Sequence, residues 1–200
     1  MTTSYGQFCP VALACEVLTE RWTPLVIREL LAGSQRFSEL QRGVPRMSPA
    51  LLTKRLETLT DVGIVERRAS DSGNYHTYHL TEAGEQLRPI IEQIGQWGKQ
   101  WIRHDIEEDQ LDPGLLMWDI RRGVRPDKLP ADRVVVKFQF WDAPSEDRMW
   151  WLIIDGRDVD LCLKPPGFDV DVTVDTDLET MIAAWLGDID VAESVRDGQI

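Results

Sequence analysis

The chain has 200 residues, of which 42% are hydrophobic and 28% charged, a composition that excludes a mainly disordered or collagen-like protein. Its net charge of −12 is unevenly distributed: residues 1–104 hold 12 Lys and Arg against 11 Asp and Glu, whereas residues 105–200 hold 10 against 23. This asymmetry predicts two units with different partners, and a local basic excess between Arg21 and Arg68 keeps DNA among the candidate partners.

The first predicted elements are four helices, inferred from apolar residues that recur every three or four positions and from residues that begin and end helices. They span residues 10–20, 23–33, 38–42 and 48–62. Ser48 followed by Pro49 is typical of a helix N-terminus, and Thr23 followed by Pro24 predicts the same start for the second helix. Leucines at intervals of four and three give the fourth helix one apolar face, so its polar face is expected to point outward.

A β-hairpin is predicted directly after the fourth helix. Two short strands, residues 64–68 and 75–80, flank a turn rich in Ser, Asp, Gly and Asn. A hairpin in this position predicts a winged helix-turn-helix, whose fourth helix enters the major groove while the hairpin reaches the flanking backbone or minor groove.

Candidate DNA contacts are the polar or small residues on the outer face of the fourth helix and in the adjoining loops and hairpin. They are Arg36, Arg46, Ser48, Ala50, Thr53, Lys54, Arg55, Arg67, Arg68, Asn74 and His76. Arginine can read a guanine edge with two hydrogen bonds, whereas Lys, Ser and Asn at such positions usually hold phosphate. The alternative is that these charges only solvate an amphipathic surface.

The same stretch resembles the HxlR-type, MarR-related transcription regulators over residues 8–103. The matching positions are Cys9-Pro10, Trp22, Arg36-Phe37-Ser38-Glu39-Leu40, Ser48, Leu52, Arg55-Leu56, Leu59, Gly63 and Tyr78-His79-Leu80-Thr81-Glu82-Ala83-Gly84. The resemblance implies a cytoplasmic prokaryotic repressor or activator that binds DNA as a homodimer.

A further helix is predicted from Thr81 to about His104, with a kink or break at Pro89. Apolar residues spaced three and four apart form a seam along it, a pattern that favours dimerisation. The seam residues are Leu87, Ile90, Ile94, Trp97 and Trp101. The alternative is a core helix within the domain, and a two-fold dimer would match a palindromic operator with half-sites about one helical turn apart.

The C-terminal half predicts an α+β unit at residues 115–200, after a polar linker at 105–114. A short helix at 115–120 precedes alternating apolar residues that predict an antiparallel meander, and a final helix covers one face of the sheet. The strands are expected at residues 133–141, 149–154, 159–163 and 168–174, and the helix at 178–186. The fold class is therefore α+β, with a winged helix-turn-helix domain at 1–104.

Aromatic and sulfur-containing side chains in this sheet exceed what a thin core requires, which predicts a pocket for an apolar small molecule. The candidate ligand contacts are Phe138, Trp141, Met149 and Trp151, and the alternative is that they are core or dimer contacts. Three segments, residues 168–180, 185–188 and 195–198, resemble the sterol-carrier-protein-like fold, with coverage of about 115–200. That resemblance implies binding of lipids or other apolar ligands between the sheet and the helices.

No catalytic or metal-binding motif is recognisable, so we expect no enzyme activity, cofactor or metal ion. The three cysteines do not form a disulfide framework, and the absence of an apolar N-terminal stretch predicts a cytoplasmic protein with no membrane partner. Cys9 precedes the first helix, where the HxlR resemblance implies an oxidant or electrophile sensor. Structural packing of this thiol is the alternative, and Cys15 is expected in the core.

These patterns predict a homodimeric DNA-binding transcription regulator whose C-terminal domain binds an apolar small molecule. The alternative is a lipid-binding or protein-interaction module that uses the winged helix only for dimerisation. The basic excess between Arg21 and Arg68 favours the regulator, because such a module has no need of it.

Overall fold

The computed structural model describes residues 4–70, 73–102, 106–130 and 132–200, and the chain divides into two compact units, Met1–His104 and Asp105–Ile200. Within the described residues, no helix combines the length and the apolar character needed to cross a membrane. The expected end of the dimer helix at His104 and part of the predicted hairpin turn, residues 71–72, lie outside the described residues.

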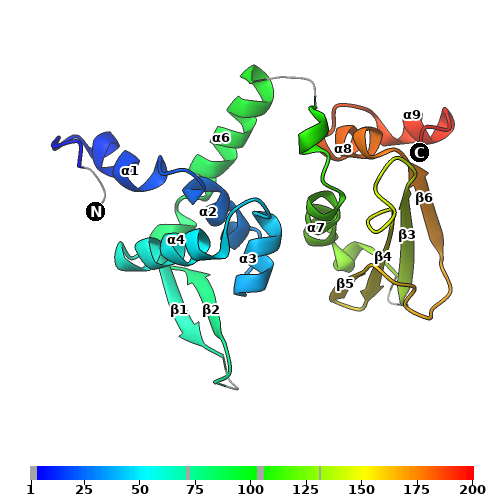
Figure 1. Ribbon diagram of the computed structural model, residues 1–200, viewed down its shortest axis with the longest axis horizontal. Helices are drawn as coiled ribbons and strands as arrows, with labels where there is room; N and C mark the ends of the chain where they lie inside the picture. Colours follow the sequence, from blue (N-terminus) through cyan, green and yellow to red (C-terminus); the bar gives the residue numbers. More distant parts are fainter. Residues whose placement is uncertain (1–3, 71–72, 103–105, 131) are drawn as a thin grey trace. The chain divides into compact units, whose positions relative to one another are not determined.

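The first unit is a winged helix-turn-helix (Figure 1). Its elements are α1 (Pro10–Leu18), α2 (Thr23–Leu31), α3 (Phe37–Gly43), α4 (Pro49–Asp61), β1 (Val65–Ala69), β2 (His76–Leu80), α5 (Glu82–Glu85) and α6 (Arg88–Trp101). β1 and β2 pair antiparallel and extend away from the helices as the wing.

The core of this unit holds α4 by its leucines. Leu52, Leu56 and Leu59 are buried together with apolar residues of α2 and α3 and with Val65 at the start of the wing. Ser48 caps α4, since its hydroxyl accepts a hydrogen bond from the backbone N–H of Leu51 at 3.3 Å. The predicted start and apolar face of the fourth helix are therefore confirmed.

One expected helix start differs, and the break expected near Pro89 is present. α2 is preceded by Trp22, which occupies the left-handed region with φ 78°, so Thr23 is the first helical residue and not the cap. The helix expected from Thr81, with a kink or break at Pro89, is broken: α5 ends at Glu85, and α6 begins at Arg88. Pro89 lies in the first turn of α6, where its missing N–H removes no helical hydrogen bond, so a break is more stable than a kinked continuous helix.

The second unit is a four-stranded sheet with helices. Its elements are the 3₁₀ turns η1 (Glu108–Gln110) and η2 (Pro126–Lys128), α7 (Pro113–Gly123), β3 (Val134–Phe140), β4 (Met149–Asp155), β5 (Asp158–Cys162), β6 (Val172–Thr176), α8 (Leu178–Leu186) and α9 (Val191–Arg196). α7 and α8 share a core with one face of the sheet, in which Phe140 and Met117 are fully buried.

The expectation of a wholly antiparallel meander is wrong. The strand order is β5-β4-β3-β6, and β6 pairs parallel with β3. The chain after β5 contains Pro165 and Pro166 and does not turn back in a tight hairpin; β6 instead joins the opposite edge of the sheet. Asp171 anchors this entry, because its N–H donates to the Val135 carbonyl at 2.9 Å and its carboxylate accepts from the Val135 N–H at 2.8 Å.

Candidate DNA-binding surface

The outward face of α4 consists of short side chains and one lysine. Each residue turns an α-helix by about 100°, so Ala50 and Lys54 lie opposite the buried leucines and Thr53 lies beside Ala50 on the flank away from Arg55. All three are exposed, as is Ser48 at the N-terminus. The hydroxyl of Thr53 donates to the Pro49 carbonyl at 3.0 Å. The structure therefore brings four of the predicted contacts together at the N-terminal half of the helix.

Arg55 lies on the flank of α4 and not on this face. Its guanidinium forms an ion pair with Glu20, and its Nε–H donates to the backbone carbonyl of Arg21 at 3.3 Å. Only 13% of the Arg55 side chain is exposed. Sequence reasoning missed both partners, because nothing in the local pattern relates two residues that far apart in the chain.

The wing carries the second group of predicted contacts. Arg67, Arg68, Asn74 and His76 are all exposed. Arg67 and His76 are diagonal neighbours across the hairpin, with an Arg67 guanidinium nitrogen 3.0 Å from His76 Nδ1, and Arg68 pairs with Glu66. Two arginines on an exposed ribbon give this hairpin the charge and reach to contact phosphate.

Arg36 links the start of α3 to the wing. Its guanidinium donates to the Tyr75 hydroxyl at 3.2 Å and lies 5.0 Å from the centre of the Tyr75 ring. Backbone pairing of Arg36 with Thr77 adds a second connection between the same segments. Tyr75 is thus a contact of the surface that the sequence did not indicate, whereas Arg46 is exposed in the turn before α4 as predicted.

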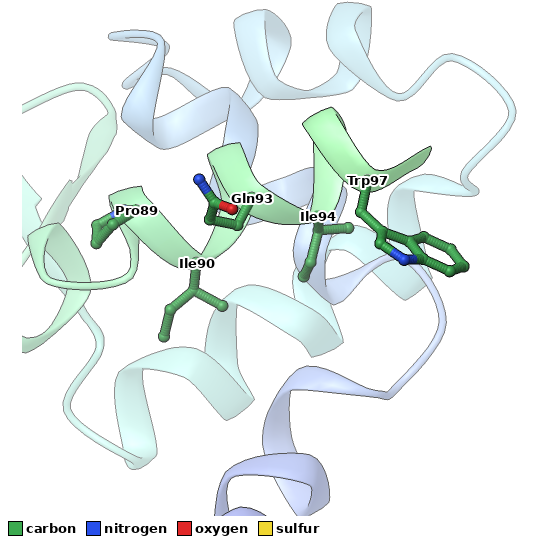
Figure 2. A pocket seen from close by; sticks show the side chains of 5 residues that line it. All are labelled: Pro89, Ile90, Gln93, Ile94 and Trp97. Atoms are coloured by element: carbon green, nitrogen blue, oxygen red, sulfur yellow. The ribbon is translucent and has the colours of Figure 1, made fainter. Parts of the chain in front are cut away.

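A separate apolar face runs along α6. The exposed fractions are 45% for Ile90, 53% for Ile94, 57% for Trp97 and 65% for Trp101. Figure 2 shows the first three of these side chains along the helix, where they line a surface pocket of about 560 Å³ with Pro89 and Gln93. Leu87 differs from the rest of the predicted seam: it caps α6 and packs against the core of its own unit.

Comparison with known proteins identifies the family of the N-terminal unit. Residues 17–106 match the family described as HxlR-like helix-turn-helix. The HTH-type transcriptional regulator YvaP of Bacillus subtilis is 37% identical over 99 residues, which cover 48% of this chain and 92% of YvaP. The chain belongs to the HxlR family. It is therefore a transcriptional regulator and not an enzyme.

Other relatives cover a similar share of this HxlR-family regulator. Rv3095, an HTH-type transcriptional regulator of Mycobacterium tuberculosis, is 36% identical over 119 residues, which cover 53% of this chain and 73% of Rv3095. The structure of the reduced form of the transcriptional regulator YodB from B. subtilis is 32% identical in sequence, with a TM-score of 0.42. The matched region covers 48% of this chain and 95% of YodB. The family match covers residues 17–106, nearly all of which belong to the winged-helix unit at Met1–His104.

The cysteine at the start of α1 has an electrostatic environment of its own. Cys9 is exposed and immediately precedes α1. The backbone N–H groups of Ala12 and Val11, in the first turn of α1, stabilise the thiolate and hold the pKa of Cys9 below its ordinary value. Cys15 is half-buried and is not one of the buried core residues.

The four candidate ligand contacts of the C-terminal unit do not converge on one face. Phe138 pairs with Trp150, and both side chains belong to the core beneath α7 and α8. Met149 and Trp151 flank Trp150 on the same strand, so they point to the opposite face. Trp151 is buried there, whereas Met149 and Trp141 are exposed.

Within the described residues, no group of three or more His, Cys, Asp or Glu side chains could hold a metal ion.

Proposed function

We propose that this HxlR-family regulator binds a palindromic operator as a homodimer in the cytoplasm. The observation that carries the proposal is that the first unit has two exposed surfaces of different chemical character. The outer face of α4 and the wing present polar and basic groups, whereas α6 presents a continuous apolar row. The first surface suits a nucleic acid and the second suits another protein surface.

In this proposal α4 enters the major groove and the wing contacts the flanking backbone. Ala50 and Thr53 lie near the N-terminus of α4, the part of a recognition helix that contacts base edges. Lys54 and the wing arginines supply phosphate contacts, which fix the position of the protein on the duplex without reading sequence.

The homodimer forms when two copies of α6 pack their apolar faces together. Ile90, Ile94, Trp97 and Trp101 supply this interface. The exposed apolar residues of the N-terminal segment, Phe8 and Val11 among them, extend the apolar surface that a partner subunit can cover. A two-fold dimer presents two copies of α4, so the operator is expected to contain two inverted half-sites about one helical turn apart.

Selection of bound fragments from a random DNA pool, with the full chain, tests this function. We expect enriched sequences with two inverted half-sites, and gel shifts on them whose affinity falls steeply with salt. No enrichment over the starting pool would refute DNA recognition. Enrichment of single, unpaired half-sites would refute the dimeric arrangement while leaving DNA binding in place.

Cys9 is the proposed redox-sensing residue, on the basis of its exposure and its lowered pKa. The thiolate is the form that reacts with oxidants and electrophiles, so these two properties favour reaction at this cysteine. The expected result is that the electrophile diamide changes operator affinity of the wild type and leaves Cys9→Ser unaffected. An equal response of both proteins would refute the assignment.

Modulation by an apolar small molecule in the C-terminal unit is the remaining part of the proposal, and the exposed side chains of Trp141 and Met149 are its candidate contacts. A ligand that binds the native state raises the melting temperature. We expect at least one member of a panel of fatty acids, sterols and aromatic compounds to do so with the full chain. An unchanged melting temperature across the panel would refute this part and favour core or dimer contacts for these residues.

A further inference from the structure

Arg55 is the only arginine of α4, and its side chain contacts the segment between α1 and α2. Its guanidinium pairs with Glu20, while its Nε–H donates to the Arg21 carbonyl. The two contacts use different sides of the guanidinium group, so they fix its orientation as well as its position. The Glu20 side chain is 30% exposed, which leaves the pair partly shielded from water.

The segment that receives Arg55 is itself held firmly. Trp22 is the only non-glycine residue with a positive φ among those that the structure describes, a conformation that costs about 1–2 kcal/mol. Its ring packs against the core of the unit, and the Arg21 guanidinium lies 5.4 Å from the ring centre. A residue attached to this segment is therefore attached to the rigid body of the domain.

The position of Arg55 on α4 separates it from the residues that face outward. It lies about 140° around the helix from Ala50 and about 160° from Thr53, on the side toward the α1–α2 segment. An arginine that reads guanine needs both donors of its outer edge directed at the base. Arg55 can make that contact only by leaving Glu20 with a partly buried, unpaired carboxylate.

We propose that Arg55 is a positioning residue: it fixes the orientation of α4 through Glu20 and the Arg21 carbonyl and makes no contact with DNA. The inference rests on the proposed DNA-binding function. It leaves sequence reading by α4 to the short side chains at Ala50 and Thr53, with Lys54 on phosphate. It also predicts that Glu20, an acidic residue, supports binding to a polyanion.

A charge swap tests the proposal, with the full chain and a fragment from the DNA selection. Arg55→Glu is expected to weaken binding, and addition of Glu20→Arg is expected to recover most of the loss because the ion pair re-forms with reversed polarity. If Arg55 contacts DNA, the double variant stays as weak as Arg55→Glu, since a carboxylate then faces the phosphates. The melting temperature and far-ultraviolet circular dichroism of each variant confirm that it is folded.

A second, milder variant separates the two roles by the sign of its effect. Glu20→Gln is expected to weaken operator binding roughly fivefold, in line with a partly exposed ion pair. Release of an arginine that contacts DNA would instead leave affinity unchanged or increase it. Glu16→Gln is the matched control, because it removes the same charge but its carboxylate accepts hydrogen bonds from Ser4 and Tyr5 and does not contact α4.

Salt dependence gives an independent readout. Loss of a phosphate contact lowers the slope of log affinity against log salt by about 1, so Arg55→Gln is expected to leave that slope unchanged. A wild type that binds no fragment would overturn the proposed function and this inference together. A wild type that binds while the charge swap fails to recover affinity would overturn the inference alone.

Discussion

Trp97→Ala is expected to disrupt the dimer by removing the largest side chain from the middle of the exposed row on α6. The side chain is 57% exposed in the single chain. With roughly 200 Å² for a tryptophan side chain, dimerisation can bury about 110 Å² per subunit, or ~3 kcal/mol at about 25 cal/mol per Å². The two copies of Trp97 double this free energy, but ordering of the side chains and imperfect packing reduce the net stabilisation of the dimer. We therefore expect the dissociation constant to rise at least about 100-fold.

Sedimentation equilibrium over a series of protein concentrations measures this change. Trp141→Ala is the matched control, because that tryptophan is 58% exposed but belongs to the second unit and not to α6. We expect the control to dimerise like the wild type. A wild type that stays monomeric throughout, or equal weakening by the two substitutions, would refute the α6 interface.

Three further outcomes test the charge, thiol and packing arguments. Lys54→Gln should weaken binding about equally on all DNA sequences and lower the salt slope by about 1, and an unchanged slope would contradict a phosphate contact. The lowered pKa of Cys9 shifts thiolate formation to lower pH. The rate of its alkylation by iodoacetamide, measured by mass spectrometry, should therefore reach half its maximum at a pH below the ordinary thiol pKa of about 8.5. A midpoint at or above that pH would count against the stabilised thiolate. Gly84→Ala should destabilise the fold by roughly 1–3 kcal/mol in urea unfolding, because the new Cβ would lie 2.4 Å from the Ile64 carbonyl oxygen. Gly95→Ala, whose Cβ meets no atom within 4 Å, should instead be neutral or stabilising, and equal effects of the two would refute the packing argument.

The winged helix could be predicted from the sequence because its signals are local. Ser48 and Pro49 mark the start of α4, and the spacing of its leucines identifies the buried face. The spacing on α6 likewise predicted an apolar row, although Leu87 packs into its own unit. A periodic pattern identifies a face but does not distinguish a core from an exposed surface, so spacing alone places Leu87 on the same face as Ile90.

Among the candidate DNA contacts, the sequence indicated residue types but not their partners. Arg55 and Lys54 are adjacent and both basic, yet one is held against Glu20 and the other is exposed. The same holds for the aromatic residues of the sheet, where alternation along β4 sends Trp150 and Trp151 to opposite faces. A shared pocket could not be inferred from their proximity in the chain.

By itself, the sequence determined most of the helices and strands, where α4 begins, and that the charge of the two halves differs, since these depend on neighbouring residues; it did not indicate α9 (Val191–Arg196). Only the tertiary structure decided that β6 joins β3 in parallel, that α6 exposes its tryptophans, and that Arg55 meets Glu20. The strand pairing and the ion pair join residues distant in sequence, and the chain contains no local signal for which distant partner a strand edge or a guanidinium group will meet. Packing of the whole unit selects among them.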